Sequence, residues 1–199
     1  MDERVLGRTG RSVSVVGQGC WQLGADWGEV SEDGAMAILH AAVDAGVTFL
    51  DTADVYGDGR SERLVGRLLA ERGSHGLTVA TKMGRRANPH AAEAYTLDAF
   101  RAWTDRSREN LGVETLDLVQ LHCPPTDVFY RPEIFGTLRD LKKEGKIKHF
   151  GVSVERVEEG LKAMEFEGMR SIQVIYNLFR QRPQERLFPI AREKGVGII

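Results

Sequence analysis

Short apolar runs alternate with longer stretches of mixed polarity along most of the chain. The runs VTFLD, LTVATK, LDLVQLH, KIKHFGVS, SIQVIYN and VGII are rich in Val, Ile and Leu, which is typical of strands covered on both faces. A glycine stands just before each run, at positions 46, 73, 112, 145, 168 and 195, and glycine readily takes the left-handed conformation that ends a helix. The pattern therefore predicts strands at 48–51, 78–82, 116–122, 147–153 and 172–176, after a first strand near Val16, with a seventh that begins at Val196.

Helices are expected in the stretches between these strands. Three of them should begin after Ser31, Ser61 and Thr96, because a side-chain oxygen at these positions can accept a hydrogen bond from the unpaired amides of a first helical turn. Alternating helices and parallel strands predict an α/β fold, either a closed barrel or a doubly wound open sheet.

Two features favour the (β/α)8 TIM barrel. No G-x-G-x-x-G motif opens the first helix, so the doubly wound alternative lacks its dinucleotide fingerprint. Polar residues also gather at the carboxyl ends of successive strands, where barrels place their chemistry. The opening segment VLGRTGRSVSVVG predicts a β-hairpin that turns at Thr9 and Gly10 and covers the floor of the barrel.

We expect residues 1–199 to form one domain, because no linker or low-complexity segment divides them. About six βα units and the start of a seventh strand are present, whereas a closed barrel takes about 250 residues. We therefore expect an incomplete barrel, the first part of a protein of roughly 300 residues.

Composition narrows the classes of function. The net charge is -2, and Lys and Arg are scattered, which excludes the basic patch of a nucleic-acid-binding protein. The first residues, MDERVLGRTG, lack the apolar core of a signal peptide, and no apolar run approaches the roughly 18 residues of a membrane span. Cys20 and Cys123 fit no CxxC pattern, so we expect a reducing, cytoplasmic location without membrane attachment.

Three strands end on a residue with reactive chemistry. Because side chains alternate along a strand, Asp51, Lys82 and His122 are each expected on the face that points into the barrel, and Tyr56 lies in the loop just beyond Asp51. The four side chains would then converge on the upper rim.

Such a cluster can supply a proton to a carbonyl oxygen. An aspartate beside a buried lysine keeps it charged, and that ammonium should lower the pKa of Tyr56 from its usual value of about 10. The phenol would then serve as a general acid, and His122 would orient the substrate oxygen. No set of His, Cys and carboxylate residues has the spacing of metal ligands, so no metal is expected. Taken alone, Lys82 suits a Schiff-base lyase equally well.

The segments LDTADVYGDGRSERLVGRLL, VATKMG, LDLVQLH, KEGKIKHFGVS and IQVIYN, in this order, resemble the aldo-keto reductase family. The resemblance runs from GQGCWQLG to GVGII. It implies a barrel that reduces an aldehyde or a ketone by hydride transfer from NADPH, or less often NADH, without a metal. The catalytic tetrad of the family falls on Asp51, Tyr56, Lys82 and His122, with Tyr56 as the proton donor.

The resemblance also implies contacts to the cofactor. Gln173 and Ser153 match the ligands of the nicotinamide carboxamide, although Val154 stands where many members have asparagine. Gly19, Cys20 and Trp21 are similar to a first loop that lies near the nicotinamide. The phosphate ligands of the family, and with them the choice between NADPH and NADH, would lie beyond Ile199, so we expect this chain to bind the dinucleotide poorly.

Aromatic residues in the predicted upper loops are candidates for a substrate pocket, namely Trp21, Trp27, Phe129 and Tyr130. Arg85 and Arg86 follow Lys82 closely, and two interpretations fit them: contact with an anionic substrate, or a solvated loop, which is favoured. The small-molecule substrate and the oligomeric state stay open.

Two alternatives to a reductase are considered. One is a reductase-like regulatory subunit that binds the cofactor with little turnover, which the complete tetrad disfavours. The other is a Schiff-base lyase that uses Lys82, which Asp51 disfavours by keeping the amine protonated.

Overall fold

The computed structural model describes residues 1–26 and 28–199, so Trp27 and its predicted place in a pocket lie outside the described residues. Seven strands form one parallel sheet in which spatial order follows chain order. They are β3 Gln18–Gly19, β4 Phe49–Asp51, β5 Thr78–Met83, β6 Leu116–His122, β7 Ile147–Val154, β8 Met169–Val174 and β9 Gly197–Ile198.

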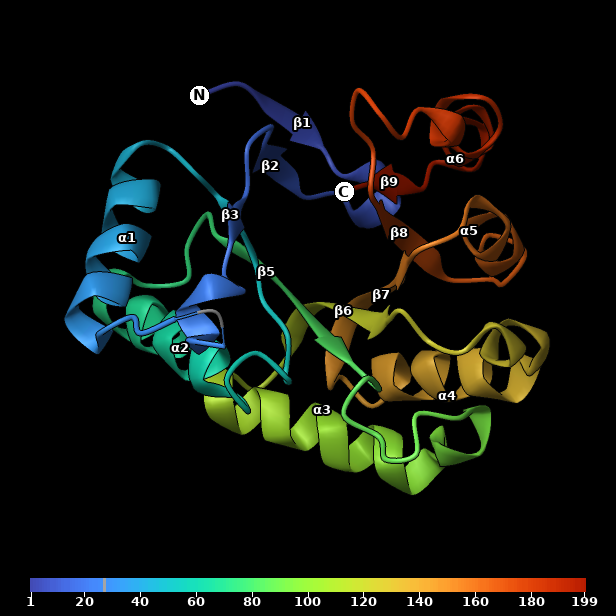
Figure 1. Cartoon of the computed structure of the whole chain (residues 1–199), viewed down its shortest axis with the longest axis horizontal. Coiled ribbons are helices and arrows are strands. Elements are labelled where there is room, and N and C mark those ends of the chain that lie inside the picture. The colour runs from blue at the N-terminus through green and yellow to red at the C-terminus, as the bar shows by residue number, and fades with distance from the viewer. Residues whose placement is uncertain (27) are drawn as a thin grey trace.

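Within the described residues, six α-helices connect these strands and cover the outer face of the sheet. Figure 1 shows them as an arc around the strands, with the hairpin near the N-terminus and β9 close together on the open side. The helices are α1 Glu32–Asp44, α2 Arg60–Arg72, α3 Leu97–Leu111, α4 Pro132–Lys143, α5 Val157–Ala163 and α6 Leu187–Lys194. The expected α/β barrel architecture is confirmed as a curved half-barrel, with β3 and β9 at its two edges.

The N-terminal hairpin covers the floor of the half-barrel, as expected. Strand β1 (Glu3–Val5) pairs with β2 (Ser12–Ser14) in antiparallel fashion, and Gly10 turns the chain with φ 71°. Arg11 donates hydrogen bonds to the oxygen of Leu77 (2.6 Å) and to Oγ1 of Thr78 (3.1 Å), at the amino end of β5. An inner apolar cluster joins the hairpin to the strands and consists of Leu6, Val13, Phe49, Ala80 and Leu118.

Local signals at the helix ends explain most of the boundaries. Ser31 and Thr96 cap α1 and α3, accepting hydrogen bonds from the amides of Gly34 (3.1 Å) and Ala99 (3.2 Å). All six glycines predicted at helix-to-strand junctions have positive φ, between 63° and 93°. Strand β8 begins at Met169, three residues before the prediction, because it pairs with β7 from Phe150 onward.

The predicted cap at Ser61 is wrong. Helix α2 begins at Arg60, and its N-cap is Gly59, with φ 86°. The hydroxyl of Ser61 is buried instead, where it donates to the oxygen of Cys20 (2.8 Å) and is hydrogen-bonded to the hydroxyl of Thr52 (2.8 Å). Buried polar groups at the ends of β3 and β4 need a partner, and this demand takes precedence over capping.

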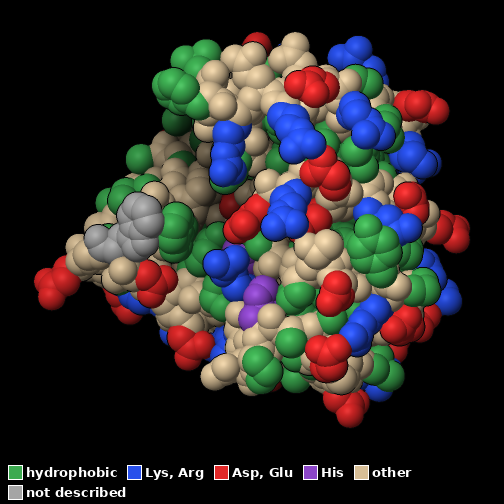
Figure 2. All heavy atoms as spheres, turned by 45° about the vertical axis from the view of Figure 1, so that its right-hand side comes forward, with side chains coloured by type: hydrophobic (Ala, Val, Ile, Leu, Met, Phe, Trp, Pro, Cys, Tyr) green, Lys and Arg blue, Asp and Glu red, His purple; other side chains and the backbone are tan. Residues whose placement is uncertain are grey.

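The charges that Figure 2 shows are mixed, with Lys and Arg interspersed among Asp and Glu over the visible face. Among the described residues, none of the helices combines the length and the apolar character that a membrane crossing requires.

Close backbone contact positions the loop that carries Tyr56. Gly57, with φ 58°, packs on the 3₁₀ helix η2 (Gln22–Gly24), and a Cβ at Gly57 would lie 2.2 Å from the oxygen of Gly24. The side-chain Oδ2 of Asp26 accepts a hydrogen bond from the Gly57 amide at 3.0 Å. Only glycine fits both the space and the backbone conformation at this position.

We expect Gly57→Ala to lower the free energy of unfolding by about 1–3 kcal/mol, because the added methyl group overlaps a backbone atom that cannot move freely. Gly136→Ala is the matched control, since the nearest atom to its new Cβ lies 3.7 Å away on the side chain of Arg139. Alanine on helix α4 should stabilise the control by about 0.5–1 kcal/mol. Urea unfolding of both variants measures the difference, and equal stabilities would contradict the close contact.

Candidate active site

Four polar side chains from three strand ends and one loop meet above the sheet. Asp51 and His122 are the last residues of β4 and β6, and Lys82 is the last but one of β5. The parallel register sets Asp51 beside Ala80 and Lys82 beside Gln120, so the strand ends lie side by side. The structure thus brings the predicted set together with Tyr56.

Lys82 is the centre of this group. Its side chain is 2% exposed, and Nζ donates hydrogen bonds to Oδ2 of Asp51 (2.8 Å), the oxygen of Thr52 (2.9 Å) and Oη of Tyr56 (3.3 Å). An ammonium group has three protons to donate, so each has an acceptor. The pairing with Asp51 offsets the high free energy of burying a charge.

The ring of Tyr56 lies between two other rings. It is 6.2 Å from Trp21, nearly parallel to it, and 5.8 Å from His122, edge to face, measured between ring centroids. The ammonium of Lys82 lies 5.1 Å from the centroid of the Tyr56 ring. These contacts fix the phenol beside both the ammonium and the imidazole.

The predicted fall in the pKa of Tyr56 is wrong for this site. Burial raises the pKa of Tyr56 above its usual value, and the charge of Lys82 lowers it by less. The carboxylate of Asp51, which balances Lys82, raises the pKa of Tyr56 further. The phenol is therefore fully protonated at neutral pH.

His122 is uncharged at neutral pH. Burial, followed by the charges of Lys82 and Arg85, lowers the pKa of His122 to about 3. Its Nδ1 is buried and has no hydrogen-bond partner among the described residues. His122 can thus offer a hydrogen bond, but it holds no spare proton for transfer.

Tyr56, Lys82 and His122 line a cavity of about 550 Å³. Ser153 and Gln173, which sequence reasoning assigned to the cofactor, line it from β7 and β8, and Trp21 lines it from the loop after β3. Val154, which stands where many family members have asparagine, also lines this cavity. Among the described residues, no group of three or more His, Cys, Asp or Glu residues is placed to hold a metal ion.

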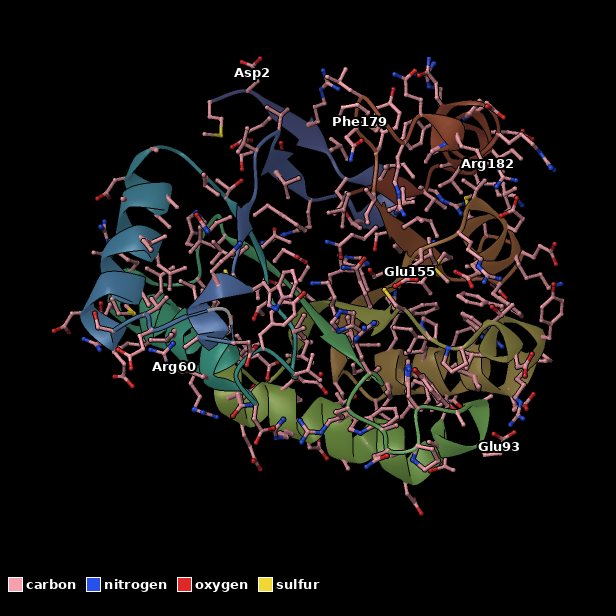
Figure 3. All side chains as sticks on the ribbon, viewed as in Figure 1. Asp2, Arg60, Glu93, Glu155, Phe179 and Arg182 are labelled. Carbon is pink, nitrogen blue, oxygen red and sulfur yellow. The ribbon has the colours of Figure 1, made fainter. Side chains whose placement is uncertain are left out.

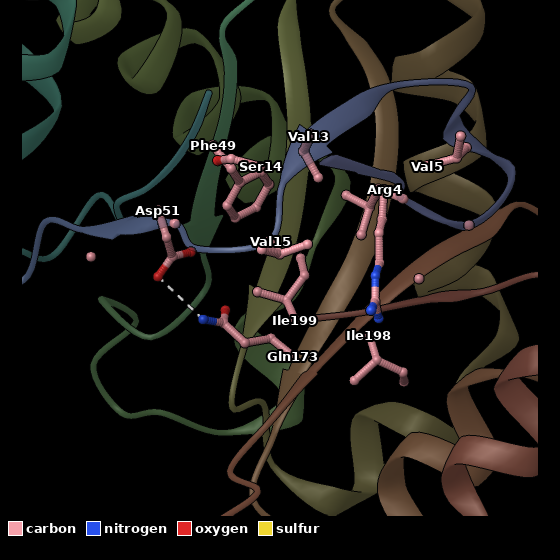
Figure 4. A pocket seen from close by; sticks show the side chains of 15 residues that line it. Arg4, Val5, Val13, Ser14, Val15, Phe49, Asp51, Gln173, Ile198 and Ile199 are labelled. Carbon is pink, nitrogen blue, oxygen red and sulfur yellow. Dashed lines mark hydrogen bonds between the residues drawn. The ribbon is translucent and has the colours of Figure 1, made fainter. Parts of the chain in front are cut away.

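Gln173 links the two sides of the half-barrel. Its Nε2 donates to Oδ2 of Asp51 (3.2 Å), across the sheet from β8 to β4, and its Oε1 accepts from Nε2 of Gln120 (2.9 Å). Figure 4 shows this contact at the edge of a second cavity, also of about 550 Å³, which the hairpin and β9 line. Gly19 lies on the wall of this second cavity.

Cys20 does not reach either cavity. It is completely buried, its amide donates to the oxygen of Asp51 (2.8 Å), and burial raises the pKa of its thiol to about 12. Its contacts join the loop after β3 to the end of β4.

The other aromatic residues predicted for the pocket lie elsewhere. Phe129, in the 3₁₀ helix η4 (Thr126–Tyr130), is 0% exposed and packs against Phe135, with 6.4 Å between ring centroids. Tyr130 is 67% exposed, and Nζ of Lys162 lies 5.3 Å from the centroid of its ring. Neither lines the cavity beside Tyr56, because η4 folds back over α4 and α5.

Comparison with known proteins agrees with this geometry. The sequence profile of the Aldo/keto reductase family matches residues 15–199. The chain belongs to this family. Aldo-keto reductases are NAD(P)H-dependent oxidoreductases, and the curved parallel sheet found here is part of their barrel.

Individual relatives cover nearly the whole chain or all of it. It is 32% identical to the probable aldo-keto reductase 1 of Glycine max over 98% of its length, and 31% identical to the uncharacterized oxidoreductase YqkF of Bacillus subtilis over 100%. The solved aldo-keto reductase AKR11C1 from Bacillus halodurans, in its holo form, matches all of the chain with a TM-score of 0.86 and 28% identity. The chain spans 57%, 63% and 65% of the lengths of these three proteins.

Sequence reasoning missed a buried carboxyl group in this aldo-keto reductase. Asp54, between Asp51 and Tyr56 in the loop, is 0% exposed. Burial, then the nearby charge of Glu62, raises the pKa of Asp54 to about 7. Glu62 itself is buried, but it accepts hydrogen bonds from Oγ1 of Thr81 (2.6 Å) and from an asparagine of α3.

The raised pKa makes the stability of this aldo-keto reductase fall with pH. In the folded state the pKa of Asp54 is about 7, against 3.8 in an exposed chain, so between these values the folded state binds more protons than the unfolded state. The free energy of unfolding therefore falls as pH rises through this window, and ionised Asp54 is most destabilising above it.

We expect Asp54→Asn to raise the free energy of unfolding at pH 8 by about 2 kcal/mol and to flatten its dependence between pH 4 and 7. Chemical unfolding at a series of pH values measures both effects. Asp140→Asn, which removes a surface carboxylate 3.2 Å from Lys143, serves as the control and should change stability by less than about 0.5 kcal/mol. A variant with an unaltered pH profile would rule out a buried, titrating Asp54.

Proposed function

We propose that this aldo-keto reductase reduces an aldehyde or a ketone to an alcohol, with NAD(P)H as the hydride donor and Tyr56 as the general acid. The observation that carries the proposal is the position of Nζ of Lys82, within hydrogen-bond distance of both Oδ2 of Asp51 and Oη of Tyr56. In this arrangement the phenol of Tyr56 can give up a proton, and the ammonium of Lys82 stabilises the negative charge that is left on the phenolate oxygen.

Tyr56 transfers its proton to the carbonyl oxygen of the bound substrate. The nicotinamide, when bound, supplies a hydride with both electrons of the new C–H bond. The oxygen keeps the electron pair of the former double bond and takes the phenolic proton, so that hydride and proton together complete the alcohol. The ammonium of Lys82, 3.3 Å from Oη, stabilises the phenolate that forms, and this lowers the barrier to proton transfer.

His122 orients the substrate in this scheme. Its ring lies 5.8 Å from that of Tyr56, and its pKa of about 3 keeps it neutral. A neutral imidazole can hold the carbonyl oxygen by a hydrogen bond without competing as a proton donor.

Ser153 and Gln173 fit the carboxamide of a nicotinamide. A hydroxyl and a primary amide line the cavity, and together they offer donors and acceptors that match those of a carboxamide. Because Gln173 also bonds to Asp51, a cofactor held there is tied to the residues of proton transfer. NADPH is favoured over NADH on family resemblance.

The contacts of Lys82 argue against a Schiff-base lyase. Formation of a Schiff base needs a neutral amine, whereas Lys82 is paired with Asp51 and uses all three of its protons in hydrogen bonds. The presence of all four tetrad residues in contact argues against a purely regulatory role.

Cys20 and Cys123 are unpaired, which suits the cytoplasmic location that we propose.

We expect Tyr56→Phe to lower kcat by about 100- to 10,000-fold for every aldehyde that the wild type reduces, because the general acid is lost. The decrease in NADPH absorbance with a panel of aldehydes measures the rate. Tyr130→Phe is the control, since the side chain of Tyr130 is exposed and lies away from the cavity. A Tyr56→Phe enzyme with more than half the wild-type rate would exclude Tyr56 as the proton donor.

A further inference from the structure

Arg85 places a second positive charge on the wall of the active-site cavity. It follows strand β5 by two residues and lines the same cavity of about 550 Å³ as Tyr56 and His122. The side chain is exposed, so its guanidinium is open to a ligand that enters from solvent. Arg85 is exposed, as expected for a solvated loop, and it also lines the cavity.

The other cations near the site are already neutralised. Lys82 is paired with Asp51 at 2.8 Å, and Arg86 is paired with Asp58 at 3.2 Å. The guanidinium of Arg85, in contrast, forms no ion pair or hydrogen bond with any of the residues that the structure describes. The charge of Arg85 nevertheless acts on a residue of the site, because it contributes, after burial and Lys82, to the lowered pKa of His122.

Two carboxylates also line the cavity. The carboxylate of Asp26 is held by the amide of Gly57 at 3.0 Å. Glu155 follows β7 and lies near the middle of the view in Figure 3, and within the described part of the chain no ion pair joins it to Arg85. Of the two cations among the described residues that line the cavity, Lys82 is paired with Asp51, so the charge of Arg85 is the one available to bind an anionic ligand.

We propose that Arg85 is a specificity-determining residue that binds a carboxylate carried by the carbonyl substrate, so that the enzyme prefers oxo-carboxylates over neutral aldehydes and ketones. A planar guanidinium holds a carboxylate through two parallel hydrogen bonds, and a bound substrate that displaces water strengthens them. The preference in catalysis rests on the proposed reductase function, whereas the binding of the anion to Arg85 does not.

Two aldehydes of the same shape but different charge test whether the enzyme recognises the charge of its substrate rather than the size. Para-carboxybenzaldehyde carries the anion, and para-formylbenzamide replaces it with a neutral amide. We expect the wild type to reduce the carboxylate with a kcat/KM about tenfold higher, and Arg85→Gln to abolish that preference through KM, with kcat nearly unchanged. Arg86→Gln is the matched control and should keep the wild-type preference, because its partner is Asp58.

Binding without turnover gives the second measurement. Ligand-observed NMR should show that para-(hydroxymethyl)benzoate binds the wild type about tenfold more tightly than its amide counterpart, and that Arg85→Gln binds both equally. Arg85→Lys should recover part of the preference, since it restores the charge without the planar pair of donors. Equal binding of both ligands by the wild type, or an unchanged preference in Arg85→Gln, would overturn the assignment. If neither aldehyde is reduced but the binding difference holds, the reductase proposal fails and the anion site stands.

Discussion

The whole site depends on a buried ammonium group at the end of one strand. Taking a charge out of water has a penalty of several kcal/mol unless partners surround it. For Lys82 those partners are the carboxylate of Asp51, the oxygen of Thr52 and the hydroxyl of Tyr56. The need to give the Lys82 ammonium three acceptors therefore determines where β4 ends, which path the chain takes after β4 and where the phenol of Tyr56 lies. Gly57, which permits the close packing of that loop on η2, supports the same arrangement from outside.

Burial and the charge of Lys82 oppose each other at Tyr56 but act together at His122. At Tyr56 burial raises the pKa by more than the charge of Lys82 lowers it, and the carboxylate of Asp51 raises it further. At His122 both effects favour the neutral ring, so they add. The site thus holds its proton on the phenol and keeps the imidazole uncharged, which separates the proton donor from the orienting group without any lowering of the phenol pKa.

Local patterns in the sequence were sufficient for the scaffold and for the proposed tetrad. Alternation along each strand placed Asp51 and Lys82 on one face, and glycines marked the junctions between helices and strands. What failed depended on burial, which no local pattern reveals. The sequence predicted Phe129 to be an aromatic residue of a pocket loop, but its side chain is buried in the core. It predicted Ser61 to be a helix cap, but its hydroxyl is hydrogen-bonded to buried groups instead. Asp54 gave no signal, since its environment arises only when α2 and α3 pack beside its loop.

An anion at Arg85 would alter the electrostatics that the reaction uses, and the size of each effect decides the outcome. Neutralising Arg85 removes one of the charges that disfavour a protonated His122. Burial is the largest cause of the low pKa of His122 and Lys82 the second, and a substrate that fills the cavity strengthens the first while leaving the second in place. His122 therefore stays neutral with the substrate bound, and recognition of an anion by Arg85 can coexist with proton transfer from Tyr56.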